Sequence, residues 1–76
     1  MKILFLVTGK NCPLCDEARK LLFDFEVGDI QILELDVQTD DKLHIDYWDK
    51  IPVILYRDKS LSWPFNEKTI RDFILN

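Results

Sequence analysis

Hydrophobic and polar positions along the chain change their spacing in a way that predicts distinct strands and helices. Residues 3–7 form an unbroken apolar run, ILFLV, which is typical of a strand buried on both faces. From Pro13 onward the apolar residues recur every three or four positions, which predicts a helix. Gly28 is predicted to end that helix. The helix would bury one face, made of Leu14, Ala18, Leu21, Leu22 and Phe25.

The rest of the chain predicts three more strands and two more helices. The pattern predicts a strand at 30–37, a short helix at 39–48, a β-hairpin at 53–57 and 60–63, and a closing helix at 66–75. A strand, a helix and a strand within the first half make a βαβ unit, so its strands should be parallel. The order β-α-β-α-β-β-α predicts a four-stranded mixed sheet with helices on both faces, which is a thioredoxin-like α/β arrangement.

Size and charge narrow the function classes. The chain has 76 residues, enough for a single domain spanning 1–76. Its net charge of −4 argues against a nucleic-acid surface, which needs clustered Lys and Arg. No apolar run is long enough to span a membrane, and the apolar N-terminus lacks the cleavage site of a signal peptide. We therefore expect a cytoplasmic monomer with neither nucleic-acid nor membrane partners.

The two cysteines, Cys12 and Cys15, lie in NCPLC, directly after the first predicted strand and at the start of the first predicted helix. The first amides of a helix lack intrahelical partners, so a Cys12 thiolate could accept hydrogen bonds there and would feel the positive end of the dipole. Lys10 adds positive charge, whereas Asp16 and Glu17 oppose it. We predict a moderately lowered pKa for the Cys12 thiol, which makes Cys12 the nucleophile.

Cys15 is predicted to be the resolving thiol. It lies one helical turn after Cys12, within reach of an S–S bond, and would attack a mixed disulfide on Cys12. A structural metal is an alternative, but zinc usually takes four ligands and the chain adds only His44 to the two cysteines. Two cysteines that merely pack are a third interpretation. The position of C-x-x-C at a helix start favours redox chemistry.

A proline provides the second signal. Pro52 in DKIPVILY opens the third predicted strand, where proline is tolerated. In a thioredoxin-like sheet, this loop lies beside the helix that carries the cysteines. We expect a cis Ile51–Pro52 bond, which would expose the backbone of Ile51 to an extended substrate segment. An ordinary trans proline is the alternative. The predicted substrate-binding residues are Lys10, Pro13, Leu14, Ile51 and Pro52.

With these features placed, nearly the whole chain resembles glutaredoxin-like proteins of the thioredoxin superfamily. It is similar to a short bacterial group with C-x-L-C-[DE]-x-A, I-P-V and W-P-F-[DN]. The resemblance implies that Cys12 is the nucleophilic thiol, Cys15 the resolving thiol and Pro52 the cis-proline. The matching residues are Cys12, Leu14, Cys15, Asp16, Ala18, Ile51, Pro52, Val53, Trp63, Pro64, Phe65 and Asn66.

The sequence also departs from typical glutaredoxins. Leu14 stands where they carry Tyr or Phe, and Lys50-Ile51 replaces their Thr-Val before the proline. The Gly-Gly pair that helps bind glutathione has no counterpart in SLSWPFNEK, residues 60–68. Trp63 and Phe65 partly match small redoxins that reduce ribonucleotide reductase. These two aromatic residues either form an apolar rim for a partner or, as we favour, pack under the last helix.

The sequence therefore predicts a thiol–disulfide oxidoreductase that reduces disulfides of proteins or small molecules. It needs no bound cofactor or metal, and a thioredoxin-reductase-like protein or glutathione would recycle it. One alternative is a binding module that uses Cys12 and Cys15 for a metal or an Fe–S cluster. Another is a redoxin that donates electrons to ribonucleotide reductase.

Overall fold

The computed structural model describes residues 2–25 and 30–75. The order β-α-β-α-β-β-α is confirmed, with a single turn of 3-10 helix added after the second strand. The predicted helix end at Gly28 lies outside the described residues. The elements are β1 (Lys2–Thr8), α1 (Pro13–Phe23), β2 (Ile30–Asp36), η1 (Val37–Thr39), α2 (Asp41–Tyr47), β3 (Val53–Tyr56), β4 (Lys59–Ser62) and α3 (Glu67–Leu75).

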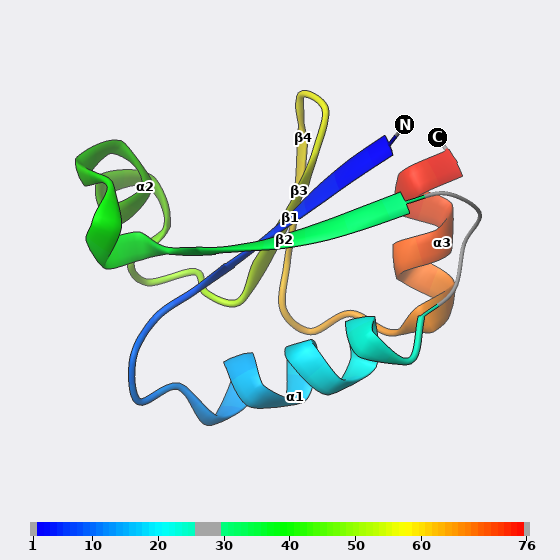
Figure 1. Ribbon diagram of the computed structural model, residues 1–76, viewed down its shortest axis with the longest axis horizontal. Helices are drawn as coiled ribbons and strands as arrows, with labels where there is room; N and C mark the ends of the chain where they lie inside the picture. Colours follow the sequence, from blue (N-terminus) through cyan, green and yellow to red (C-terminus); the bar gives the residue numbers. More distant parts are fainter. Residues whose placement is uncertain (1, 26–29, 76) are drawn as a thin grey trace.

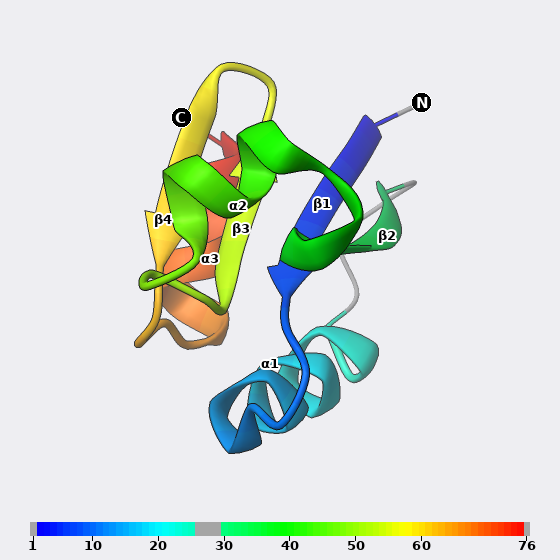
Figure 2. The same cartoon turned by 90° about the vertical axis from the view of Figure 1, so that its left-hand side faces the viewer.

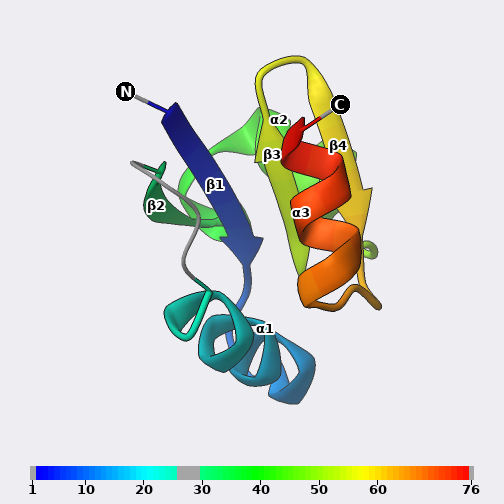
Figure 3. The ribbon, with the colours of Figure 1, turned by 90° about the vertical axis from the view of Figure 1, so that its right-hand side faces the viewer.

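The four strands form one mixed sheet in the order β2-β1-β3-β4 (Figure 1). β1 runs parallel to β2 and antiparallel to β3, and β3 and β4 are antiparallel. Figures 2 and 3 show α2 on one face of the sheet and α3 on the other. The predicted fold class, with helices on both faces, is therefore confirmed. α1 is the crossover helix that connects the parallel strands β1 and β2. It therefore starts just after the C-terminal end of β1.

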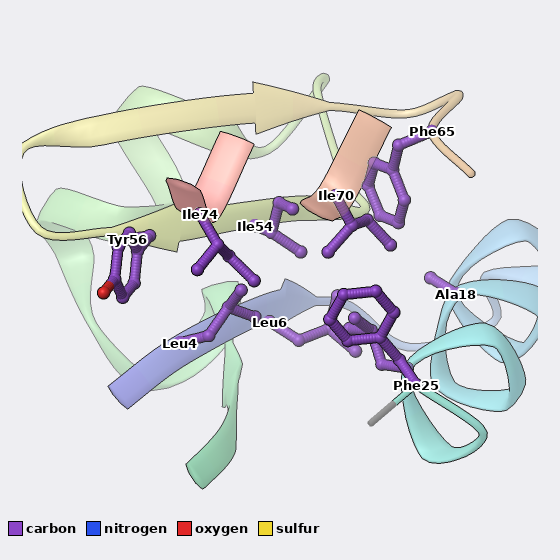
Figure 4. Packing of buried hydrophobic residues seen from close by; sticks show 10 residues of the cluster. Leu4, Leu6, Ala18, Phe25, Ile54, Tyr56, Phe65, Ile70 and Ile74 are labelled. Carbon is purple, nitrogen blue, oxygen red and sulfur yellow. The ribbon is translucent and has the colours of Figure 1, made fainter. Parts of the chain in front are cut away.

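The main core lies between one sheet face and the helices α1 and α3 (Figure 4). Alternate residues of the two central strands point into it, because side chains of a strand alternate between faces. A smaller cluster lies on the opposite face, where Val7, Val37 and Val53 are buried and Tyr47 packs against them. The main cluster consists of Leu4, Leu6, Ala18, Leu22, Phe25, Ile54, Tyr56, Phe65, Ile70 and Ile74.

The structure corrects the predicted buried face of α1. Leu14 was expected in the core, but its side chain is 44% exposed, whereas Cys15 is 0% exposed. Successive residues of a helix are rotated by about 100°. The helix is turned so that Cys15, Ala18 and Leu22 face inward, and Leu14 is then directed away from the sheet.

The hairpin also differs from the prediction by one residue. β3 ends at Tyr56 rather than Arg57, and Tyr56 pairs with Lys59. Arg57 has φ 58°, the left-handed backbone that a two-residue hairpin turn requires. The two turn residues are therefore Arg57 and Asp58, which polar patterning alone does not specify.

The aromatic residues after β4 pack as the favoured interpretation expected. Phe65 is buried in the main cluster, and the Trp63 ring meets it edge-on with the ring centroids 5.0 Å apart.

None of the helices in the described ranges is long and apolar enough to cross a membrane.

The packing of α3 predicts the response to two matched truncations on that helix. Ile70 is 0% exposed and Leu75 is 67% exposed. Ile70→Ala should lower the free energy of unfolding by about 2–5 kcal/mol, because it removes buried methylenes and leaves a cavity. Leu75→Ala should change it by less than about 0.5 kcal/mol. Urea unfolding of both variants measures the difference, and equal costs would contradict the assigned face of α3.

Candidate active site

The loop between β1 and α1 places Cys12 as the N-cap of α1. Asn11 adopts φ 54°, a left-handed conformation that asparagine tolerates better than most residues. Cys12 itself is extended, with φ −120° and ψ 96°, and Pro13 occupies the first helical position. Pro13 favours a helix start at this position, because its ring fixes the φ angle that the first turn needs. The N–H that proline lacks would have no partner inside the helix anyway.

Cys12 and Cys15 form a disulfide, with their Cα atoms 5.2 Å apart, within the range that such a bond requires. The Cys15 N–H donates to the Cys12 sulfur at 3.1 Å. This confirms that an amide of the first helical turn reaches the Cys12 sulfur. Cys12 is half-buried and Cys15 is fully buried. The two sulfurs therefore differ in access, and a molecule from solution reaches Cys12 first.

The segment around Pro52 lies against the loop that precedes Cys12. At Gly9, the position of a Cβ atom would be only 2.6 Å from Ile51 Cδ1, so glycine permits this close approach. Pro52 is fully buried, and its carbonyl accepts a hydrogen bond from the Trp63 N–H at 3.0 Å. The Ile51–Pro52 peptide bond is cis, and so is Trp63–Pro64. The latter was not anticipated from the sequence.

The predicted substrate-binding residues differ in exposure. Lys10, Pro13 and Leu14 are exposed on the β1–α1 loop and the first turn of α1. Ile51 is half-buried and Pro52 is buried. The structure thus brings Ile51 into contact with the loop that leads to Cys12 and leaves Leu14 as an apolar side chain in solvent. The binding roles of these five residues, like the catalytic roles of the two cysteines, stay predictions.

A polar network that sequence analysis missed connects three elements beside the cysteines. The buried Thr8 hydroxyl, at the end of β1, donates to Glu34 Oε2 on β2 at 2.9 Å. Arg19 Nε, on α1, donates to both Glu34 oxygens at 2.8 and 3.0 Å. Arg19 Nη1 also donates to Asp16. One signal was present in the sequence, because Glu34 falls on the same face of β2 as Ile30 and Ile32.

These hydrogen bonds shift the pKa of both partners. The bond from Arg19 lowers the pKa of the Glu34 carboxyl below its ordinary value of 4.5; partial burial opposes this shift, and the Thr8 hydroxyl adds to it. The hydrogen bond to Glu34 likewise raises the pKa of Arg19, against the effect of desolvation. Glu34 is therefore ionised, and Arg19 charged, throughout the neutral range.

The part of the chain that the structure describes offers no cluster of metal ligands. Among residues 2–25 and 30–75, no group of three or more His, Cys, Asp or Glu side chains could hold a metal ion. His44, which the sequence suggested as a third ligand, is exposed on α2.

Comparison with known proteins supports the resemblance proposed from the motifs. A family model described as Glutaredoxin-like domain (DUF836) matches residues 3–75. Curated protein sequences give no match. The X-ray structure of target protein XcR50 from X. campestris is 28% identical, with a TM-score of 0.75 over 93% of both chains. Thioredoxin-like protein BC3987 is 19% identical, with a TM-score of 0.64 over 91% of this chain and 96% of that one, which shows a shared fold.

The contact between Gly9 and Ile51 predicts a specific coupling. Gly9→Ala should lower the free energy of unfolding by about 1 kcal/mol, because the new methyl displaces the tip of Ile51. Ile51→Val removes the Cδ1 atom at its own cost of about 0.5–1.5 kcal/mol. Since the double variant no longer has this clash, its loss of stability should be smaller than the sum of the two single losses. Strict additivity in urea unfolding would contradict the contact.

The low pKa of Glu34 predicts how stability depends on pH. A carboxyl whose folded-state pKa is lowered stabilises the fold above its unfolded pKa, and this contribution is lost as pH falls through the folded pKa. Glu34→Gln should therefore destabilise the protein at pH 7, by less than about 1 kcal/mol because the partners are partly exposed. The difference in the free energy of unfolding between Glu34→Gln and the wild type should shrink below about pH 4.5. Urea unfolding from pH 7 to pH 3 measures this difference, and a constant value over that range would contradict the prediction.

Proposed function

Because the chain belongs to the Glutaredoxin-like domain (DUF836) family, we propose that it is a cytoplasmic thiol–disulfide oxidoreductase that reduces disulfides of proteins or small molecules. The observation that carries the proposal is the asymmetry of the cysteine pair. An accessible Cys12 sulfur lies at the start of α1 and is bonded to a Cys15 sulfur that solvent does not reach. Such a pair exchanges with external disulfides through one sulfur only.

The reaction begins with the reduced protein. The Cys12 thiolate attacks one sulfur of a substrate disulfide, and a mixed disulfide forms while the first substrate thiolate leaves and takes up a proton. Cys15 then loses its proton and attacks the Cys12 sulfur. This step forms the Cys12–Cys15 bond and releases the second substrate thiolate, which is also protonated. The substrate has gained two electrons and two protons, and the dithiol has been oxidised.

Different residues have different roles in these two exchange steps. The Cys15 N–H, 3.1 Å from the Cys12 sulfur, is placed to stabilise negative charge there, because charge-assisted hydrogen bonds are stronger than neutral ones. The burial of Cys15 prevents it from competing for the external disulfide. Exposed Leu14 and half-buried Ile51 offer apolar contacts to the part of the substrate that flanks the disulfide.

A dithiol or two monothiols must return the pair to its reduced form. Either a thioredoxin-reductase-like partner or glutathione would provide the electrons. We propose Lys10, exposed at the loop before Cys12, as a contact for an anionic group of the reductant or substrate. The chain acts without a bound cofactor, since the electrons reside in the two sulfurs.

The first test is a redox titration in glutathione buffers of set potential, with free thiols trapped by alkylation and counted by mass. A reversible two-thiol transition between roughly −180 and −270 mV is expected, the interval that contains thioredoxin, glutaredoxins and protein disulfide isomerase. If both thiols stay alkylatable at every potential, or if the bridge never opens, the proposal fails. A brown colour in the purified protein would instead support an Fe–S cluster.

Two variants separate the roles of the cysteines. Cys12→Ser should abolish the reduction of oxidised glutathione by dithiothreitol-reduced protein, because no accessible sulfur remains. Cys15→Ser should still form a mixed disulfide with one glutathione but should not release it at the wild-type rate. Intact activity in Cys12→Ser would reverse the assignment.

A further inference from the structure

We propose that Arg19 is a positioning residue for the dithiol: by holding the Asp16 carboxylate in an ion pair, it increases the thiolate fraction of reduced Cys12. This inference rests on the proposed function, because it concerns the reactivity of the same cysteine. The polar network of Thr8, Glu34, Arg19 and Asp16 would then serve to hold the Arg19 guanidinium in place.

Asp16 is the acidic residue one helical turn after Cys12. Its N–H donates to the Cys12 carbonyl at 3.3 Å, and residues four apart lie on the same side of a helix. A nearby carboxylate disfavours the formation of a second negative charge. An uncompensated Asp16 charge would therefore lower the thiolate fraction of reduced Cys12.

Arg19 supplies that compensation through Nη1, which donates to Asp16. An isolated pair on a helix surface is worth little, because two long side chains must be ordered to make it. Arg19 is not isolated, since its Nε is fixed at 2.8 and 3.0 Å from the two Glu34 oxygens. Glu34 is fixed in turn by the buried Thr8 hydroxyl at 2.9 Å. Three elements thus hold the guanidinium beside Asp16.

Asp16 and the Arg19 guanidinium lie at a similar distance from Cys12. Asp16 is about 6 Å along the helix axis from Cys12, and the bond from Arg19 Nη1 places the guanidinium beside that carboxylate. This is less than the screening length of about 8 Å at physiological ionic strength. Because Asp16 also helps to hold Arg19 in this position, the influence of Arg19 on the thiolate should be smaller when Asp16 is absent.

A double-mutant cycle tests this dependence. Reduced protein is treated with neutral iodoacetamide across a range of pH, and peptide mapping assigns the first addition to Cys12. Arg19→Met should move the pH profile of the Cys12 alkylation rate to higher pH. At pH 7 it should slow alkylation by about two- to threefold, as expected for a unit charge one turn away in a largely aqueous setting. Asp16→Asn should move the profile to lower pH. In the Asp16→Asn background, Arg19→Met should change the rate by clearly less than it does alone.

A matched control tests whether the loss of any surface arginine has the same effect. Arg71→Met removes an arginine of a comparable surface pair on α3, whose Nη2 is 3.4 Å from Glu67, and should leave the profile unchanged.

Two results would overturn the inference: no shift in Arg19→Met, or the same shift in both backgrounds. The assay needs only a reduced Cys12 and no turnover. A wild-type dithiol that titrates reversibly while Arg19→Met shifts nothing would reject this inference alone, whereas a pair that never opens would reject the proposed function.

Discussion

The rotation of α1 about its own axis is the constraint on which the rest of the site depends. Ala18 and Leu22 are held in the main core, and the same rotation places Cys15 inside. Leu14 and Cys12 are consequently left toward solvent. A rotation of α1 by one residue, about 100°, would turn Cys15 out of the core. The chemical asymmetry of the dithiol is thus a result of apolar packing several residues away from it.

A second constraint brings together two segments that are remote in sequence. The β1–β3 pairing sets Val7 opposite Val53, so the chain leaving β1 and the chain entering β3 emerge at the same end of the sheet. Gly9 lets these two segments touch. The candidate site therefore lies at the end of β1, which pairs with β2 on one side and with β3 on the other. The cysteine loop follows β1 and the Pro52 segment precedes β3, and both of these strands are largely buried.

Sequence patterning was sufficient for the fold and for the location of the cysteine pair. The apolar run of β1 and the helix signals after Pro13 are local features, and their order restricts the sheet to few topologies. Details that depend on tertiary contacts were not accessible. Leu14 and Cys15 are equally plausible inward positions from periodicity alone, and only the packing of α1 on the sheet decides between them. The turn at Arg57 depends on a single backbone angle, for which arginine gives no signal.

The polar network was missed for a related reason. Glu34 interrupts an inward-facing apolar set on β2, and such a residue usually has a partner, because burying part of a charge without one is unfavourable. Sequence identifies the anomaly but not the partner, which comes from α1. In a chain with a net charge of −4, a nucleophile that must itself become an anion is disfavoured by its surroundings. The structure opposes this locally, through the Cys15 amide at the sulfur and an arginine tied to the acidic residue one turn away. Overall acidity and a reactive thiolate are therefore compatible, because fixed local dipoles and charges act at shorter range than the screened net charge.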